Sequence, residues 1–300
     1  MSPAERSEVA VAGRTLSVSN LEKLLYPAAG FTKGQVLDYY ARIAPVMLPH
    51  LTGRPITLKR YPDGVDGAHF FEKNCPSHRP SWIPTHTVVV EAGRRSVGFC
   101  LIQEPAALVW TANLAAIELH PGLAVVGDLT RPTVMVFDLD PGPPAGLKEC
   151  AEVALLLRDS LGVLGLKAVA KTSGSKGLQV YVPLNSATDF EATRQFSLAL
   201  AQILERQRPD LVVTNMSKDV RPRKIFIDWS QNSSFKTTVA VYSLRARERP
   251  TVSTPVRWEE LEKDPESLRF EAADVLDRVK AEGDLFEPVL QLEQQLPVLA

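Results

Sequence analysis

Two aspartates separated by one residue follow a strongly apolar segment near the middle of the chain. Val134 to Phe137 form an apolar segment rich in β-branched residues, as is typical of a buried strand. Asp138 and Asp140 come at its end, before a Pro-Gly stop. Successive side chains of a strand alternate between its faces, so both carboxylates are expected to point the same way. Two carboxylates this close repel each other unless a cation lies between them. The spacing therefore predicts a site for one or two Mg²⁺ or Mn²⁺ ions, as used in nucleotidyl transfer, although Asp140 could instead simply open a turn.

A second group of residues has the chemistry needed to hold phosphates. The loop Ser173-Gly174-Ser175-Lys176-Gly177 lies between two predicted strands and offers backbone N–H groups, hydroxyls and an ammonium. It is not a Walker A loop, because the Gly-x4-Gly-Lys-Ser/Thr spacing is absent and no helix follows. A plain hairpin turn is the alternative interpretation.

A third carboxylate, Asp228, lies inside the apolar segment Ile225–Trp229, directly after the basic segment Lys218–Lys224. A lone carboxylate in an apolar strand is costly unless it is paired or bound to a metal. The neighbouring cations could supply that salt bridge, or they could clamp a triphosphate.

Hydrophobic periodicity predicts that helices alternate with strands along the chain. The expected strands, besides the one that ends at Asp138, lie at residues 55–61, 84–90, 96–102, 167–172, 179–184, 225–229 and 236–243, after a short hairpin at 8–19. The expected helices lie at residues 33–48, 105–119, 147–161 and 188–207, followed by a helical tail from residue 258 that is broken at 265 and 283. Thr32 is expected to cap the first helix, and Thr188 with Glu191 to form a capping box for the fourth. His120 is expected at the C-terminal end of the second helix, where a positive charge is favourable.

Several exposed-type residues could contact DNA. Lys23 and Lys33 are expected near helix beginnings, where they could reach a phosphate or could simply be solvated. Lys59 and Arg60 lie on a predicted strand. The adjacent Phe70 and Phe71 are expected on a loop, as stacking platforms for bases or as anchors in a small hydrophobic pocket.

Composition is that of an ordinary soluble enzyme. The chain has 300 residues, of which 45% are apolar and 23% charged. It has no apolar segment long enough to span a membrane and no signal peptide at its start. The three cysteines are scattered and lack Cys-x-x-Cys spacing, so we expect reduced thiols in a cytoplasmic protein, with no structural zinc and no disulfide.

The formal net charge of −1 hides an uneven distribution. Residues 256–300 carry 12 acidic and 5 basic side chains, whereas residues 1–255 carry 29 basic and 23 acidic ones. A mildly basic body with an acidic tail is compatible with local phosphate binding.

Many of these segments resemble, in the same order, the polymerase domain of bacterial DNA ligase D, which belongs to the archaeo-eukaryotic primase superfamily. The resemblance extends over about residues 20–250. The matching segments are Leu21–Pro27, Phe70–Asn74, Ile117–Pro121, Phe137–Pro141, Lys171–Leu178, Ile225–Asn232, Lys236–Thr238 and Tyr242–Arg245.

This resemblance implies an α/β (α+β) fold, with central β-sheets flanked by helices and an acidic helical C-terminal tail. It implies one polymerase domain over residues 1–300, with a core at about 20–250 and a helical extension at 251–300. The implied activity is template-directed nucleotidyl transfer that fills gaps and extends DNA ends in double-strand-break repair by non-homologous end joining. Such enzymes often prefer ribonucleotides and manganese.

The resemblance also implies roles for individual residues. Two Mn²⁺ or Mg²⁺ ions would be bound by Asp138, Asp140 and Asp228. The incoming NTP or dNTP would be held by His120, Ser173, Ser175, Lys176, Gln179, Arg221, Lys224 and Arg245. DNA would be contacted by Lys23, Lys33, Lys59, Arg60, Phe70 and Phe71, with the first two on the 5′-phosphate of a gap or break.

Two features depart from the family pattern. The family usually has histidine where this chain has Gln179, which we expect to donate a neutral hydrogen bond to the triphosphate. The Lys-x-Asp-Gly motif of a ligase nucleophile is absent. The chain is therefore expected to be either a stand-alone polymerase, with a separate DNA ligase and a Ku-like end-binding protein as partners, or one domain of a longer protein. A cytoplasmic, nucleoid-associated location is expected. Alternative functions are a primase-polymerase that starts chains de novo, or a DNA-end-bridging module with weak catalysis. A metal-dependent nuclease would have no use for the triphosphate-binding residues.

Overall fold

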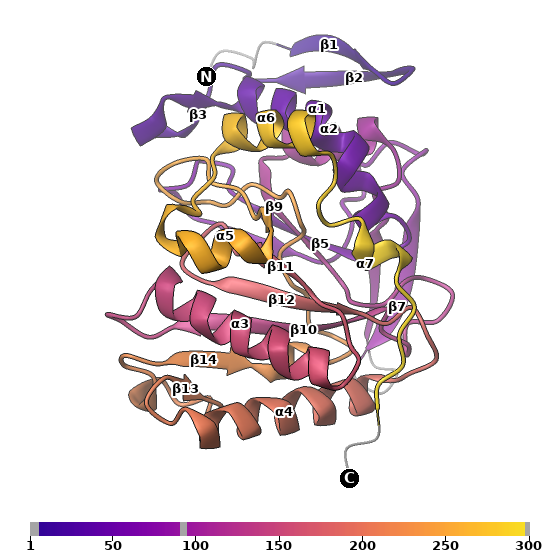
Figure 1. Cartoon of the computed structure of the whole chain (residues 1–300). Helices are drawn as coiled ribbons and strands as arrows, with labels where there is room; N and C mark the ends of the chain where they lie inside the picture. The colour runs from indigo at the N-terminus through magenta and orange to yellow at the C-terminus, as the bar shows by residue number, and fades with distance from the viewer. Residues whose placement is uncertain (1–5, 91–94, 298–300) are drawn as a thin grey trace.

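The computed structural model describes residues 6–90 and 95–297 and shows a mixed α/β fold, as the resemblance implied (Figure 1). Within these residues the largest sheet has six strands in the order β13-β14-β10-β12-β11-β15. Its strands are β10 (Val134–Pro141), β11 (Val169–Thr172), β12 (Leu178–Pro183), β13 (Val212–Val213), β14 (Ile225–Asp228) and β15 (Pro255–Val256). The central neighbours of β10, namely β12 and β14, both pair with it antiparallel. The strand that carries the two aspartates therefore lies inside the sheet.

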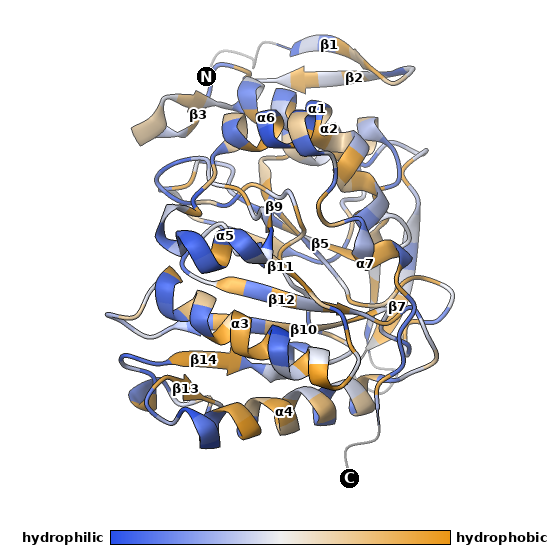
Figure 2. Cartoon of the chain, in the orientation of Figure 1, coloured by the Kyte–Doolittle hydropathy of each residue, from blue (hydrophilic) through white to orange (hydrophobic). Residues whose placement is uncertain are grey.

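Two long helices pack against this sheet and form one of the two hydrophobic cores found in the described residues. They are α3 (Leu147–Val163) and α4 (Phe190–Gln207). Leu157 and Leu161 of α3 and Leu204 of α4 are fully buried with the apolar side chains of β10, β12 and β14. Figure 2 shows the mixture of hydrophobic and hydrophilic residues along both helices. This amphipathic pattern is what the sequence periodicity predicted.

A second sheet carries the remaining residues of interest. Its strands run in the order β6-β5-β8-β7, and β9 also pairs with β5. They are β5 (Ile56–Arg60), β6 (Phe70–Glu72), β7 (Thr85–Val90), β8 (Arg95–Cys100) and β9 (Ala116–Pro121). The turn expected at residues 91–95 lies, except for Arg95, outside the described residues.

The N-terminal part covers the second hydrophobic core. The elements of this part are β1 (Arg6–Val11), β2 (Arg14–Ser19), β3 (Leu24–Tyr26), β4 (Phe31–Thr32) and α1 (Lys33–Leu51), joined by α2 (Pro105–Asn113), which follows β8 in the chain. The side chain of Thr32 accepts a hydrogen bond from the backbone N–H of Gln35, and the Gln35 side chain accepts one from the Thr32 N–H. The predicted cap of this helix is thus confirmed as a reciprocal capping box.

The C-terminal segment folds back onto both cores. Its helices are α5 (Trp258–Lys263), α6 (Ala272–Glu282) and α7 (Pro288–Gln291), interrupted near 265 and 283 as predicted. Val275 and Phe286 are buried in the core that contains α1, and Leu261 is buried in the core that contains α3. None of the described helices combines the length and the apolar character that crossing a membrane would need.

Several predicted elements were wrong for reasons of long-range pairing. The helix expected at 105–119 ends at Asn113, because Ala115 has a positive φ of 56° and the following residues pair as β9 with β5. His120 therefore lies on a strand and not at a helix end. Residues 236–243 form no strand; Thr237 makes one isolated bridge to Gly122, and the segment is otherwise held by loop hydrogen bonds.

Two local assignments also need correction. The N-cap of α4 is Asp189, whose side chain accepts a hydrogen bond from the Ala192 N–H at 2.7 Å, so Thr188 is not the cap. Lys23 precedes the short strand β3 and not a helix.

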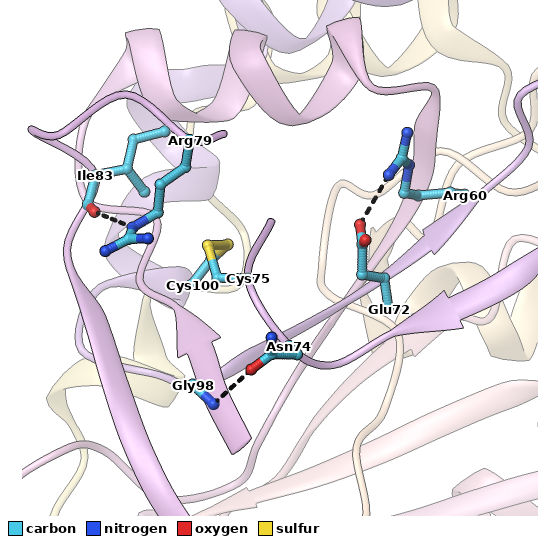
Figure 3. The surroundings of a disulfide bond; sticks show 8 residues. All are labelled: Arg60, Glu72, Asn74, Cys75, Arg79, Ile83, Gly98 and Cys100. Carbon is cyan, nitrogen blue, oxygen red and sulfur yellow. Dashed lines mark hydrogen bonds and ion pairs between the residues drawn. A yellow bond between two sulfur atoms is a disulfide. The ribbon is translucent and has the colours of Figure 1, made fainter. Parts of the chain in front are cut away.

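The expectation of three reduced thiols was wrong as well, because Cys75 and Cys100 form a disulfide (Figure 3). The segment after β6 runs beside β8: the Cys75 N–H donates to the Gly98 carbonyl, and the Asn74 side chain accepts from the Gly98 N–H. This pairing brings together two cysteines that are 25 residues apart in the sequence. Cys150 is free and buried.

Candidate active site

The two aspartates at the end of β10 line one cleft of about 700 Å³, as their spacing predicted. Such a volume is within the range of small-molecule sites. Asp228, on the neighbouring strand β14, is the register partner of Asp138. Because β10 and β14 pair antiparallel, residues that lie far apart in the sequence become cross-strand neighbours here.

The pKa values of Asp138 and Asp140 are both raised. Burial and the charge of Asp140 raise the pKa of Asp138 to about 7, against the opposing effects of a hydrogen bond from Gln179 and the charge of Lys171. Burial and Asp228 raise the pKa of Asp140. Among residues 6–90 and 95–297, no group of three or more His, Cys, Asp or Glu side chains is placed closely enough to hold a metal ion as it stands. Because the pKa values of Asp138 and Asp140 are raised despite the charges of Lys171, Arg221 and Arg245, these cations offset the unfavourable burial and repulsion only in part.

Asp228 is held by the 3₁₀ turn that follows it, Trp229–Gln231. Its Oδ1 accepts hydrogen bonds from the Ser230 N–H at 3.0 Å and from the Ser230 hydroxyl at 2.5 Å. Its Oδ2 accepts one from the Gln231 side-chain amide at 3.0 Å. These bonds explain how a carboxylate is accommodated next to an apolar strand, and they fix its orientation beside Asp138.

The Gly/Ser loop between β11 and β12 closes on itself next to the aspartates. The Ser173 hydroxyl accepts hydrogen bonds from the backbone N–H groups of Ser175 and Gly177, at 3.2 and 3.1 Å. Gly174 has a φ of +65°, and a Cβ on it would lie only 2.6–2.7 Å from neighbouring atoms of Val252, Ser253 and Arg245. A side chain is thus excluded there. Ser175 and the exposed Lys176 line the cleft.

Arg245 connects this loop to a buried carboxylate that the sequence reasoning missed. Its guanidinium donates to the Ser173 carbonyl at 2.5 Å, and its Nε lies 3.4 Å from a carboxylate oxygen of Glu118. Glu118 also contacts His120 at 3.0 Å and Lys59 at 3.7 Å. The available signal was a lone glutamate between Ile117 and Leu119, the same pattern that identified Asp228.

The pKa values of both Glu118 and His120 are lowered, although burial acts on the two groups in opposite directions. Burial works against ionisation of Glu118, but the hydrogen bond with His120 and the charge of Arg245 hold its pKa well below the usual range. Burial lowers the pKa of His120, although Glu118 opposes this. His120 is therefore neutral at pH 7, and it lines the cleft.

The phenylalanines of β6 are exposed and not anchored in a pocket, with 45% of Phe70 and 57% of Phe71 accessible. Strand pairing places each beside a cation of β5: the Arg60 guanidinium lies 5.3 Å from the Phe70 ring, and the Lys59 ammonium lies 5.3 Å from the Phe71 ring. Phe71 also meets His120 edge to face at 5.7 Å and lines the cleft. An exposed ring of this kind can stack on a base.

Lys33 is the first residue of α1, its backbone N–H donates to the carbonyl of Lys23 at 2.8 Å, and neither lysine lines the cleft. Lys33 is only 6% exposed and donates to the Ser19 carbonyl at 2.7 Å, whereas Lys23 pairs with Asp63 at 3.0 Å. Burial, together with the charges of Lys23 and Arg60, lowers the pKa of Lys33 to about 8. The interpretation of Lys33 as a solvated surface lysine is therefore wrong. The side chains of Lys23, Lys33 and Arg60 form a small group of cations near the start of α1.

The remaining predicted residues divide between the cleft and its surroundings. Arg221 lines the cleft, with its guanidinium 3.7 Å from the Phe226 ring, and Gln179 lines it while only 3% exposed. Lys224 is not among the lining residues and lies near Asp210. Cleft residues that the sequence reasoning did not select include Lys218, Gln231 and Arg247, of which the two cations belong to basic segments that could have identified them.

Comparison with known proteins gives consistent matches over nearly the whole chain. Residues 32–286 match the family model described as LigD, primase-polymerase domain. The chain is 42% identical over 294 residues to the multifunctional non-homologous end joining protein LigD of Mycobacterium bovis, covering 94% of this chain and 38% of that protein. It is 35% identical to the LigD protein of Pseudomonas aeruginosa, covering 86% of this chain and 30% of that protein. The chain thus spans well under half of the length of these relatives.

Among solved structures, the fold is similar to the polymerase domain of Mycobacterium tuberculosis Ligase D in complex with DNA. The TM-score is 0.87 at 41% identity, and the match covers 92% of this chain and 98% of that one.

Proposed function

Because this chain belongs to the LigD primase-polymerase family, we propose that it is a metal-dependent nucleotidyltransferase that adds nucleotides to DNA ends and gaps in non-homologous end joining. The observation that carries this proposal is the meeting of two chemistries in one cleft. Asp138 and Asp140 line the same cleft as Ser175 and Lys176 of the Gly/Ser loop. Carboxylates suit divalent cations, and hydroxyl, backbone N–H and ammonium groups suit a triphosphate.

The carboxylates offer the donor chemistry for a pair of Mn²⁺ or Mg²⁺ ions, which would draw the side chains together. Asp138, Asp140 and Asp228 offer hard oxygen ligands, and their mutual repulsion, which raises the pKa values of Asp138 and Asp140, is what a bound cation would relieve. When bound, such ions activate the primer 3′-hydroxyl and neutralise charge on the departing pyrophosphate.

The protein's own side chains would bind and orient the nucleotide. Lys176, Arg221 and Arg245 provide positive charge on the walls of the cleft. Arg245 is preorganised, because Glu118 and the Ser173 carbonyl already hold its guanidinium. Neutral His120 would lie near the sugar and phosphates, with the ring nitrogen that does not contact Glu118 left for the substrate.

DNA would be held at two places. Phe70 and Phe71 would stack on the templating side, supported by Arg60 and Lys59. Lys23 and Lys33 would bind the 5′-phosphate across a gap, where burial and the neighbouring charges of Lys23 and Arg60 lower the pKa of Lys33 and an anion would offset these charges. We further propose a preference for ribonucleotides, cooperation with a Ku-like protein and a DNA ligase, and a cytoplasmic, nucleoid-associated location.

Primer extension on gapped DNA with a downstream 5′-phosphate tests the proposal. We expect templated addition of ribo- and deoxynucleotides in the presence of Mn²⁺, and no addition by the Asp138→Ala or Asp228→Ala variants. Both variants should still bind the gapped DNA, because the phosphate contacts come from other residues. Lack of templated addition by the wild-type protein, or full activity of either variant, would refute the assignment.

A further inference from the structure

A fully buried lysine lies in line with the candidate metal site. Lys171 on β11 is the register partner of Gln179 on β12, and Gln179 is the register partner of Asp138 on β10. Residues opposite one another in antiparallel strands point to the same face of the sheet. The three side chains therefore form a row across three adjacent strands, from the 0% exposed Lys171 to the cleft.

The Nζ of Lys171 has three hydrogen-bond partners. It lies 2.5 Å from Gln179 Oε1, 2.6 Å from Ser253 Oγ and 3.1 Å from the Val239 carbonyl. The hydroxyl proton of Ser253 is donated to the Thr172 carbonyl at 2.8 Å, so the Ser253 oxygen accepts from Lys171. Burial lowers the pKa of Lys171, and the charge of Asp138 opposes this.

The contact with Lys171 orients the Gln179 amide. The amide lies between the Lys171 Nζ, 2.5 Å from its oxygen, and Asp138, its register partner on β10. Because the amide oxygen accepts from Lys171, the NH₂ group is turned towards the Asp138 carboxylate. The reverse orientation would place the amide oxygen against that carboxylate, and this contact would be repulsive.

We propose that Lys171 is a positioning residue for Asp138 that acts through Gln179, and that the Gln179 amide serves this carboxylate and not the triphosphate. The inference rests on the proposed metal-dependent function and specifies what orients one of its metal ligands. Partners behind a ligand commonly control metal affinity by holding the ligand in place. A neutral histidine at position 179 has one acceptor nitrogen and one N–H donor, so it can make the same bridge between Lys171 and Asp138.

The test compares the folded variants Lys171→Met, Gln179→Met, their double mutant and Gln179→His. Ser253→Ala is the matched control, because it removes an acceptor of Lys171 outside the path to Asp138. The first readout is Mn²⁺ binding to the protein in the absence of DNA, followed by electron paramagnetic resonance of free Mn²⁺. The second is the Mn²⁺ concentration that gives half-maximal primer extension, together with the nucleotide KM at saturating Mn²⁺.

We expect Lys171→Met and Gln179→Met each to weaken Mn²⁺ binding by about tenfold, which is the low end of effects seen for such partners. The double mutant should be no weaker than the worse single variant, because both act along one path. Gln179→His and Ser253→Ala should remain within about twofold of wild type, and nucleotide KM at saturating Mn²⁺ should not change in any of them.

Wild-type Mn²⁺ affinity in a folded Gln179→Met variant would overturn the proposal, and this variant decides the matter if Lys171→Met does not fold. Strictly additive effects in the double mutant would show that Lys171 does not act through Gln179. A raised nucleotide KM with unchanged Mn²⁺ affinity would assign Gln179 to the triphosphate instead. If the wild-type protein binds Mn²⁺ but adds no nucleotide, the proposed function fails while the positioning role is still read from Mn²⁺ binding.

Discussion

Replacing Asp138 by Asn should stabilise the metal-free protein at alkaline pH while it abolishes nucleotide addition. The substitution keeps the size of the side chain and removes its charge. In the wild-type protein that charge is opposed by burial and by the nearby carboxylates Asp140 and Asp228, with only Lys171 and Gln179 favouring it. A residue that is costly for the fold but needed for function is common in active sites.

The direction of the pH dependence follows from the raised pKa of Asp138. Its value rises from 3.8 in the unfolded chain to about 7 in the folded one. Stability from such a group is fully present below the unfolded pKa and is lost as the pH rises through the folded pKa. The shift corresponds to about 4 kcal/mol at pH 8 and less than half of that at pH 5. Partial access to solvent in the cleft makes about 3 kcal/mol a reasonable expectation at pH 8.

The measurement is thermal unfolding in EDTA at pH 8, 5 and 4, with and without excess Mn²⁺ in a parallel series. For a chain of this length, about 3 kcal/mol corresponds to a Tm higher by roughly 5 °C for the Asn variant at pH 8. The difference should shrink at pH 5 and disappear near pH 4. Excess Mn²⁺ should raise the Tm of the wild type and not that of the variant. An Asn variant that is less stable than wild type at pH 8 in EDTA would refute the electrostatic reasoning.

Three further predictions concern other parts of the molecule. Cys100→Ala should lower the free energy of unfolding by about 3 kcal/mol under oxidising conditions, because it opens a 25-residue loop; equal Tm values for variant and wild type would contradict this. Lys33→Met should remove the tighter binding of gapped DNA that carries a 5′-phosphate, measured by fluorescence anisotropy. In the wild type this preference should weaken as the pH rises above about 8, where Lys33 loses its proton. A preference that persists in the variant would assign the phosphate to other residues. Glu118→Gln should raise the nucleotide KM and destabilise the fold by about 3–5 kcal/mol, because Arg245 and Lys59 lose a buried counter-charge; unchanged extension kinetics and Tm would show that Glu118 does not organise them.

Features that depend on local sequence could be predicted correctly. The strand that ends at Asp138 and Asp140 follows from its apolar residues and from the two-residue period of strands, and both side chains do line one cleft. Thr32 with Gln35 caps α1, since a helix cap needs only residues three positions apart. The long segments that resemble the LigD polymerase domain were likewise sufficient to identify the family.

Features that depend on contacts between distant segments were decided only by the tertiary structure. The helix expected to reach Leu119 is replaced by β9, because β5 supplies backbone partners that the local pattern does not reveal. The same sheet brings Cys75 beside Cys100, which cysteine spacing alone could not indicate. Lys171 comes into line with Asp138 only through the strand order β10-β12-β11. The local sequence determines which way a side chain points along its own strand, whereas the neighbour it meets depends on which strands pair and in which register.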